Sequence, residues 1–164
     1  MISSRTDIWA TIADEAAAES PLWAAALLPS VQRELCAVFS PLGEERYALG
    51  LETIYEGYLL HYGKPRLFAP ADRDTALLLG DYLYAHGLVR IADHGDVDAV
   101  ADLAALISFC AQLRAEGKDG DGPAWAATAA LLGHAPLQAG RDAREVADPE
   151  LVERALAAHR TRVD

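Results

Sequence analysis

The sequence predicts an all-α protein, a helical bundle of about seven or eight helices in a single domain over residues 1–164. Thirty-three alanines and 23 leucines dominate the composition, and such unbranched side chains lose the least entropy in a helix. Helix start and stop signals recur along the chain, and apolar residues repeat at helical spacing. With 52% hydrophobic and 24% charged residues, the chain can bury a core of its own. We therefore expect almost no sheet.

Caps and prolines set the boundaries of the helices expected in the N-terminal part. Ser20-Pro21 and Pro29-Ser30 each place a capping residue beside a proline, which restarts a helix. Gly63 stops the longest helix of this part, and a loop over residues 63–71 follows it. The apolar stripe of the third helix consists of Val31, Leu35 and Val38. The expected helices run over about residues 6–19, from Pro21, from Ser30 to Ser40, and over 44–62.

Aspartates, glycines and prolines set the boundaries of the helices expected in the C-terminal part. Asp96 caps a helix that follows a short turn at residues 93–95, so this helix and the one before it are expected to be antiparallel neighbours. Residues 118–122 form the clearest flexible loop. Pro123 then opens an alanine-rich helix. The expected helices run from Asp72 or Asp74 to about residue 92, from Asp96 to Gly117, from Pro123 to Gly133, and from Asp148-Pro149 onward.

The charge balance excludes several classes of partner. Fourteen Lys and Arg against 25 Asp and Glu give a net charge of −11, so long-range attraction to nucleic acid or anionic lipid is absent. Cys36 and Cys110 lie in no metal-binding or disulfide pattern. Acidic residues near the N-terminus do not fit a signal peptide, and no stretch fits a transmembrane helix. These features predict a cytoplasmic protein.

Three carboxylates stand out because they lie on helices that are otherwise apolar. Glu52 and Glu56 are spaced i, i+4 on a helix that is apolar almost all round, so they share one face. They could hold a divalent cation or anchor basic partners. Asp81 falls in line with apolar residues of the next helix, so we expect it to be buried and paired. Gly80 beside it would permit close helix packing.

The signatures of several enzyme classes are missing from the sequence. The five histidines form no HxxxH, HExxH or ExxH pattern, which removes the zincin and di-iron bundle signatures. No nucleophile elbow, P-loop or GxGxxG motif occurs. The common hydrolase, NTPase and dinucleotide-binding signatures are therefore absent.

Several segments together resemble the trans-polyprenyl diphosphate synthases, a family with the isoprenoid synthase fold. Residues 78–83, LLGDYL, resemble the L-A-G-D-Y/A-L signature of that family, and residues 63–65, GKP, resemble its G-K/R-P-T segment. The helices expected over 99–117 and 124–133 resemble later family helices in the right order. The match covers roughly residues 47–137, which would make this chain similar to the N-terminal part of the fold.

The resemblance implies a role for the candidate residues. The family's first aspartate-rich motif, which holds Mg²⁺ on an allylic diphosphate, falls on Glu52 and Glu56, with Thr53 where the middle acid would be. The second such motif is absent, which resembles the non-catalytic small subunit of heteromeric long-chain synthases. The resemblance thus predicts an accessory or prenyl-binding subunit that acts with a catalytic prenyl diphosphate synthase. Its ligand-binding residues would be Asp81, Lys64, Arg66, Tyr58, Tyr84 and Leu88.

Two other functions remain open. One is a helical homo-oligomeric interaction or scaffold protein in which the three carboxylates are structural. The other is a Mg²⁺-dependent diphosphate enzyme, for which Lys64, Arg66 and Arg73 are the only nearby cations. A prenyl-binding subunit should leave an apolar tunnel between the helices over 44–62 and 72–92. A scaffold should instead fill this space with side chains such as Tyr58, Tyr84 and Leu88.

Overall fold

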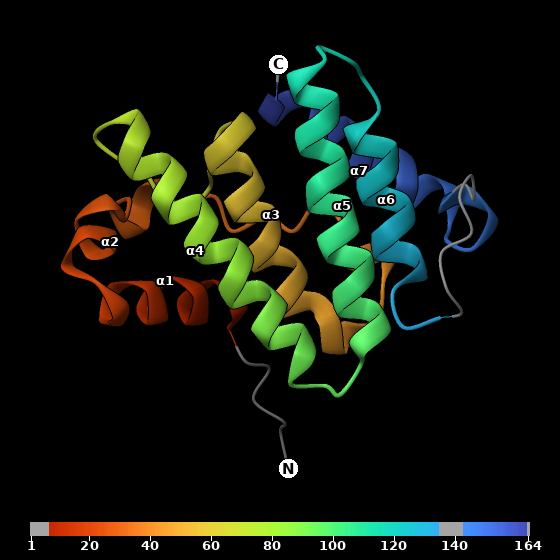
Figure 1. The fold of residues 1–164 in the computed structure, drawn as a ribbon, viewed down its shortest axis with the longest axis horizontal. Coiled ribbons are helices and arrows are strands. Elements are labelled where there is room, and N and C mark those ends of the chain that lie inside the picture. The colour runs from red at the N-terminus through yellow and green to blue at the C-terminus, as the bar shows by residue number, and fades with distance from the viewer. Residues whose placement is uncertain (1–6, 135–142, 164) are drawn as a thin grey trace.

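The computed structural model describes residues 7–134 and 143–163 and confirms the all-α prediction (Figure 1). Within these ranges there are seven α-helices and no strand, apart from an isolated bridge between Leu27 and Phe68. None of these helices is long and apolar enough to cross a membrane. The α-helices are α1 (Ile8–Glu19), α2 (Pro21–Ala26), α3 (Ala48–Tyr62), α4 (Arg73–Ala92), α5 (Val97–Ala115), α6 (Asp121–Leu131) and α7 (Pro149–Val163). Short 3₁₀ turns are η1 (Ser30–Gln32), η2 (Ser40–Leu42), η3 (Glu45–Tyr47) and η4 (Ala143–Glu145).

Side-chain caps confirm the predicted starts of α2, α4 and α5. Ser20, Asp72 and Asp96 each accept a hydrogen bond from a backbone N–H in the first turn of the helix that follows. Gly63 directly follows the last residue of α3, as predicted. The helix expected from Pro123 begins two residues earlier, with Pro123 in its first turn. These boundaries depend on local chemistry, which is why the sequence reveals them.

The third predicted helix is wrong. Only the 3₁₀ turn η1 forms there, and the chain continues without regular structure to η2. Val31 and Leu35, expected on a buried stripe, are 93% and 56% exposed. The backbone of residues 34–36 bonds to Arg66 in place of its own helical partners, since the Glu34 N–H donates to the Arg66 carbonyl.

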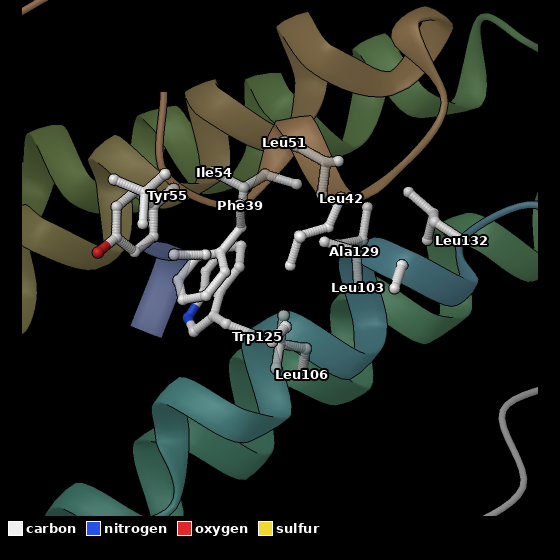
Figure 2. Close-up of a cluster of buried hydrophobic side chains, with 14 of the residues drawn as sticks. Phe39, Leu42, Leu51, Ile54, Tyr55, Leu103, Leu106, Trp125, Ala129 and Leu132 are labelled. Carbon is white, nitrogen blue, oxygen red and sulfur yellow. The ribbon is translucent and has the colours of Figure 1, made fainter. Parts of the chain in front are cut away.

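Helix α3 is the buried centre of the molecule. Every residue from Gly50 to Leu60 is buried, as expected for a helix that is apolar almost all round. Helix α4 packs against one side of α3, and an aromatic cluster lies on another side (Figure 2). There Phe39 stacks on Trp125 at 5.6 Å between ring centroids, and Tyr55 meets both rings edge-on at 5.2 and 5.1 Å.

Helices α3 and α4 pack with their backbones in contact. Glycines make this possible: a Cβ at Gly57 would lie 2.8 Å from the carbonyl oxygen of Gly80, and one at Gly87 would lie 3.1 Å from that of Gly50. The predicted role of Gly80 in close helix packing is therefore confirmed. No layer of side chains separates the two helices at these crossing points.

Substituting Gly57 tests this contact. Alanine at an ordinary helix position would stabilise the protein by about 1 kcal/mol through helix propensity. Because the new methyl group would meet the Gly80 carbonyl, we expect Gly57→Ala to lower the free energy of unfolding by about 1–3 kcal/mol. Urea unfolding measures it, with Ala157→Gly on the exposed side of α7 as the control for the ordinary difference in helix propensity. A gain in stability for Gly57→Ala would contradict the contact.

Candidate functional site

Glu52 and Glu56 lie on one face of α3, as their spacing predicts, and both bind Arg66. The Arg66 Nη1 atom lies 2.6 Å from Glu52 Oε2, and Nε lies 2.9 Å from Glu56 Oε2. All three side chains are at most 1% exposed. The basic group that the carboxylates anchor thus comes from the loop that follows α3.

Backbone groups complete the coordination of this ion cluster. Glu56 Oε1 accepts hydrogen bonds at 2.8 Å from both backbone N–H groups of residues 66–67. The Arg66 guanidinium also donates to the Cys36 carbonyl at 2.8 Å, and Glu52 accepts a backbone N–H from η2 at 3.3 Å. The cluster therefore ties α3 to the irregular segments before and after it.

Electrostatics keep Arg66 charged inside the protein. Burial would lower the pKa of its guanidinium, but the two carboxylates outweigh burial and hold that pKa above its usual value. The rings of Trp9 and Tyr55 lie 4.8 and 5.1 Å from the guanidinium carbon. The site that Mg²⁺ would need is thus occupied by an internal cation.

Mg²⁺ binding at Glu52 and Glu56 stays a prediction, and the structure shows what such binding would require. A metal ion on these carboxylates must displace Arg66, whose charge would then remain buried without a partner. In the part of the chain that the structure describes, no group of three His, Cys, Asp or Glu side chains could hold a metal ion.

The structure separates the three cations expected near a bound phosphate. Arg66 is fully buried, whereas Lys64 is 74% exposed and lies 3.5 Å from Glu34 at the surface. Arg73 donates to backbone carbonyl oxygens at the end of α3. These three side chains therefore form no common cationic site.

The prediction that Asp81 is buried is wrong. Its side chain is 70% exposed, because the side of α4 that carries it faces outward. Its neighbour is neither a backbone amide nor an arginine but His61, whose Nε2 lies 3.0 Å from Asp81 Oδ1 without hydrogen-bond geometry. Burial lowers the pKa of His61, and the charge of Asp81 opposes this effect.

Tyr58, Tyr84 and Leu88 occupy space around α3 and α4, as expected for a scaffold. Tyr58 is buried in the main core, and Tyr84 and Leu88 are half-buried and pack against that core. The Tyr84 ring also stacks on His61 with 5.0 Å between centroids. The approaches of Gly57 to Gly80 and of Gly50 to Gly87 leave no room for a tunnel between α3 and α4 at those crossing points. Tyr58 instead turns toward Asp121 on the other side of α3.

A second buried polar cluster was not identified from the sequence. Asp121, expected in a flexible loop, is buried at the first residue of α6 and accepts hydrogen bonds from Tyr58 and Arg114. His159 of α7 lies 3.5 Å from the same carboxylate and shares a 2.8 Å hydrogen bond with Tyr55. The four helices α3, α5, α6 and α7 therefore meet at Asp121.

The outward side of α4 and α5 is a further feature that the sequence analysis missed. Helix α4 crosses in front of α3, whereas α5 stands beside α3, and α4 and α5 converge at the turn between them (Figure 1). A stripe of uncharged exposed residues follows α5 beside the exposed Asp98 and Phe109, and Val89 and Val97 are 55% and 79% exposed. We call this surface the α4–α5 face, and its residues are Ala85, Val89, Ala92, Val97, Ala101, Ala104, Ala105, Ser108, Gln112 and Ala115.

Comparison with known proteins finds no match for this chain. No family model matches the chain, and neither a curated protein nor a solved structure matches it. The resemblance to polyprenyl diphosphate synthases therefore stays a prediction that rests on residues 47–137 alone. The function must be argued from the arrangement of the residues themselves.

Removing the cation of the buried cluster tests its structural importance. Arg66→Met leaves two carboxylates buried without a partner, so we expect the free energy of unfolding to fall by about 3–5 kcal/mol. Lys64→Met is the matched control, because the same exchange at an exposed ion pair costs at most about 1 kcal/mol. Urea unfolding of both variants decides the matter. Equal losses would mean that the cluster contributes little.

The Asp121 cluster predicts a dependence of stability on pH. Burial alone would raise the pKa of Asp121, but hydrogen bonds from the side chains around it hold the pKa below its usual 3.8. The unfolded chain therefore takes up a proton first as the pH falls, so the stabilisation is complete above that pH and is lost as the pH drops toward the folded pKa. We expect the stability difference between wild type and Asp121→Asn to be largest near neutral pH and to shrink below pH 3.8.

Urea unfolding at a series of pH values measures this difference. Asp119→Asn, the same exchange at an exposed neighbouring position, controls for the substitution itself. A difference for Asp121→Asn that grows as the pH falls would reverse the assigned sign.

Proposed function

We propose that the chain is a helical interaction protein that acts through its α4–α5 face and holds no small molecule between α3 and α4. The observation that carries the proposal is the face itself, a stripe of exposed uncharged residues along α5, bordered by Asp98 and Glu116, in a chain whose net charge is −11. Surfaces where proteins associate are depleted of charge at their centre. Solvent-exposed helices without a partner normally carry charged residues there.

The interior supports the ligand-free part of the proposal. At the glycine crossings, α3 and α4 approach too closely for a prenyl chain to pass between them. The polar atoms of Glu52 and Glu56 are satisfied by Arg66 and by backbone N–H groups. A diphosphate bound through Mg²⁺ would require this cluster to break first.

The chain's resemblance to prenyl diphosphate synthases predicts a catalytic subunit as the partner. That prediction shares the interaction role and differs only in the identity of the partner. It requires a full-length synthase, with both aspartate-rich motifs, to contact this chain. The same crosslinking experiment that tests the face also tests this partner.

Photo-crosslinking in the native cells tests the proposed function. A photoreactive amino acid at Ala101, on the α4–α5 face, should give a discrete crosslinked protein, because this face is in contact with a partner. The same amino acid at Ala157, on the exposed side of α7, is the matched control and should give far less. Mass spectrometry identifies the crosslinked protein. Equal or absent crosslinking at the two positions would overturn the proposal.

Native mass spectrometry of the purified chain tests the absence of a ligand. Geranylgeranyl diphosphate together with millimolar Mg²⁺ should leave the mass of the protein unchanged. A complex that forms with the wild type and is lost in Glu52→Gln/Glu56→Gln would favour the prenyl-binding function instead.

A further inference from the structure

We propose that the surface where the end of α1, α2 and the first half of α4 meet binds an arginine side chain from a basic segment of another protein. Its central residues are Glu19, Trp23 and Tyr82, and we call this surface the Trp23 site. The three helices lie together at the left of the molecule in Figure 1. None of the three residues belongs to the α4–α5 face, so this inference goes beyond the proposed function and is tested independently of it.

Two aromatic rings form the centre of the Trp23 site. The ring centroids of Trp23 and Tyr82 lie 6.0 Å apart, with an angle of 32° between the ring planes, and both residues are half-buried. Aromatic rings attract cations, and a guanidinium can also stack on them because it is planar. Leu22 precedes Trp23 and is 47% exposed, and Leu78, one turn before Tyr82, is 57% exposed. These side chains add apolar surface for the residues that flank the arginine.

Glu19 supplies a carboxylate that has no cation of its own. It is exposed and makes no ion pair or hydrogen bond with residues 7–134 or 143–163. Burial and the charges of Glu19 and Glu15 raise the pKa of Tyr82, so both carboxylates lie near this ring. Glu15 is already paired, because His86 and Arg90 lie 2.8 and 2.7 Å from its Oε2 atom. Glu19 is therefore the carboxylate that is left for a cation from a partner.

The end of α1 also favours a cation beside Glu19. The last carbonyl groups of a helix carry a partial negative charge, which basic side chains usually offset. Of the described helices with 12 or more residues, α3, α4, α5 and α7 each have a His or Arg in the last turn, whereas α1 has none. An arginine bound at the Trp23 site would place its charge at this end of α1.

Two internal clusters show which cation suits two rings and a carboxylate. The Arg66 guanidinium lies beside the rings of Trp9 and Tyr55 and binds two carboxylates of α3. The Arg114 guanidinium lies 5.9 and 5.8 Å from two tyrosine rings of α3 and binds Asp121. At the Trp23 site, no arginine of the described residues lies over the rings or binds the carboxylate. A guanidinium also donates N–H groups to a carboxylate, which a quaternary ammonium ion cannot do.

An NMR titration of the full chain with two short peptides tests the site. The probes are acetyl-GLRLG-amide and the same peptide with lysine in place of arginine. The arginine peptide should shift the indole N–H signal of Trp23 in a saturable manner and leave the signal of Trp125, which is 1% exposed, unchanged. The lysine peptide should bind at least about threefold more weakly, because an ammonium group has no planar face to stack on the rings. An unchanged Trp23 signal, or equal affinity for the two peptides, overturns the proposal.

Matched variants separate this site from the general attraction of an acidic protein for a basic peptide. Glu19→Gln should weaken binding of the arginine peptide about three- to fivefold, because it removes the charge beside the guanidinium. Glu150→Gln, the same exchange at an exposed position of α7, should weaken it by less than about 1.5-fold. Tyr82→Leu, which removes one ring, should weaken it about two- to fivefold, with the Trp125 signal showing that the fold is intact. Equal losses for Glu19→Gln and Glu150→Gln contradict the assigned site.

Discussion

The ion cluster of Arg66 with Glu52 and Glu56 is the interaction on which the surrounding structure depends. Two carboxylates on the buried face of α3 would each cost several kcal/mol if no cation reached them. Because Arg66 supplies the charge, residues 63–71 must turn back along α3 and not lead straight into α4. The same cluster also positions residues 33–42, because their backbone completes its hydrogen bonds. Side chains of one helix thus position two segments that have little regular structure.

The side of α3 that faces α4 has glycines in place of larger side chains. Gly50 and Gly57 bring the backbone of α4 into contact, and any larger residue there would force the helices apart. The two sides of α3 have a common consequence, because one holds charges that are already satisfied and the other leaves no space. The close contact of α3 with α4 and the satisfied carboxylates are the two features on which the proposed interaction role of the outer helices rests.

Local chemistry explains which features could be predicted from the sequence. Ser20, Asp72, Asp96 and Gly63 act on the adjacent turn of chain, so the starts and ends of their helices are visible in the sequence. The 30–40 segment has the spacing of a helix but depends on Arg66, some 30 residues away. Spacing cannot reveal such a distant hydrogen-bond partner, and this explains why the third helix was predicted wrongly.

The same reasoning applies to the candidate site. The i, i+4 spacing of Glu52 and Glu56 correctly places two carboxylates on one buried face, which requires a cation beside them. A divalent metal and a guanidinium both meet that requirement, and the sequence pattern does not distinguish them. In this structure Arg66 meets the requirement, and a cation tethered to the chain needs no free ligand concentration. A carboxylate pair with an internal arginine in reach is thus explained first as part of the fold.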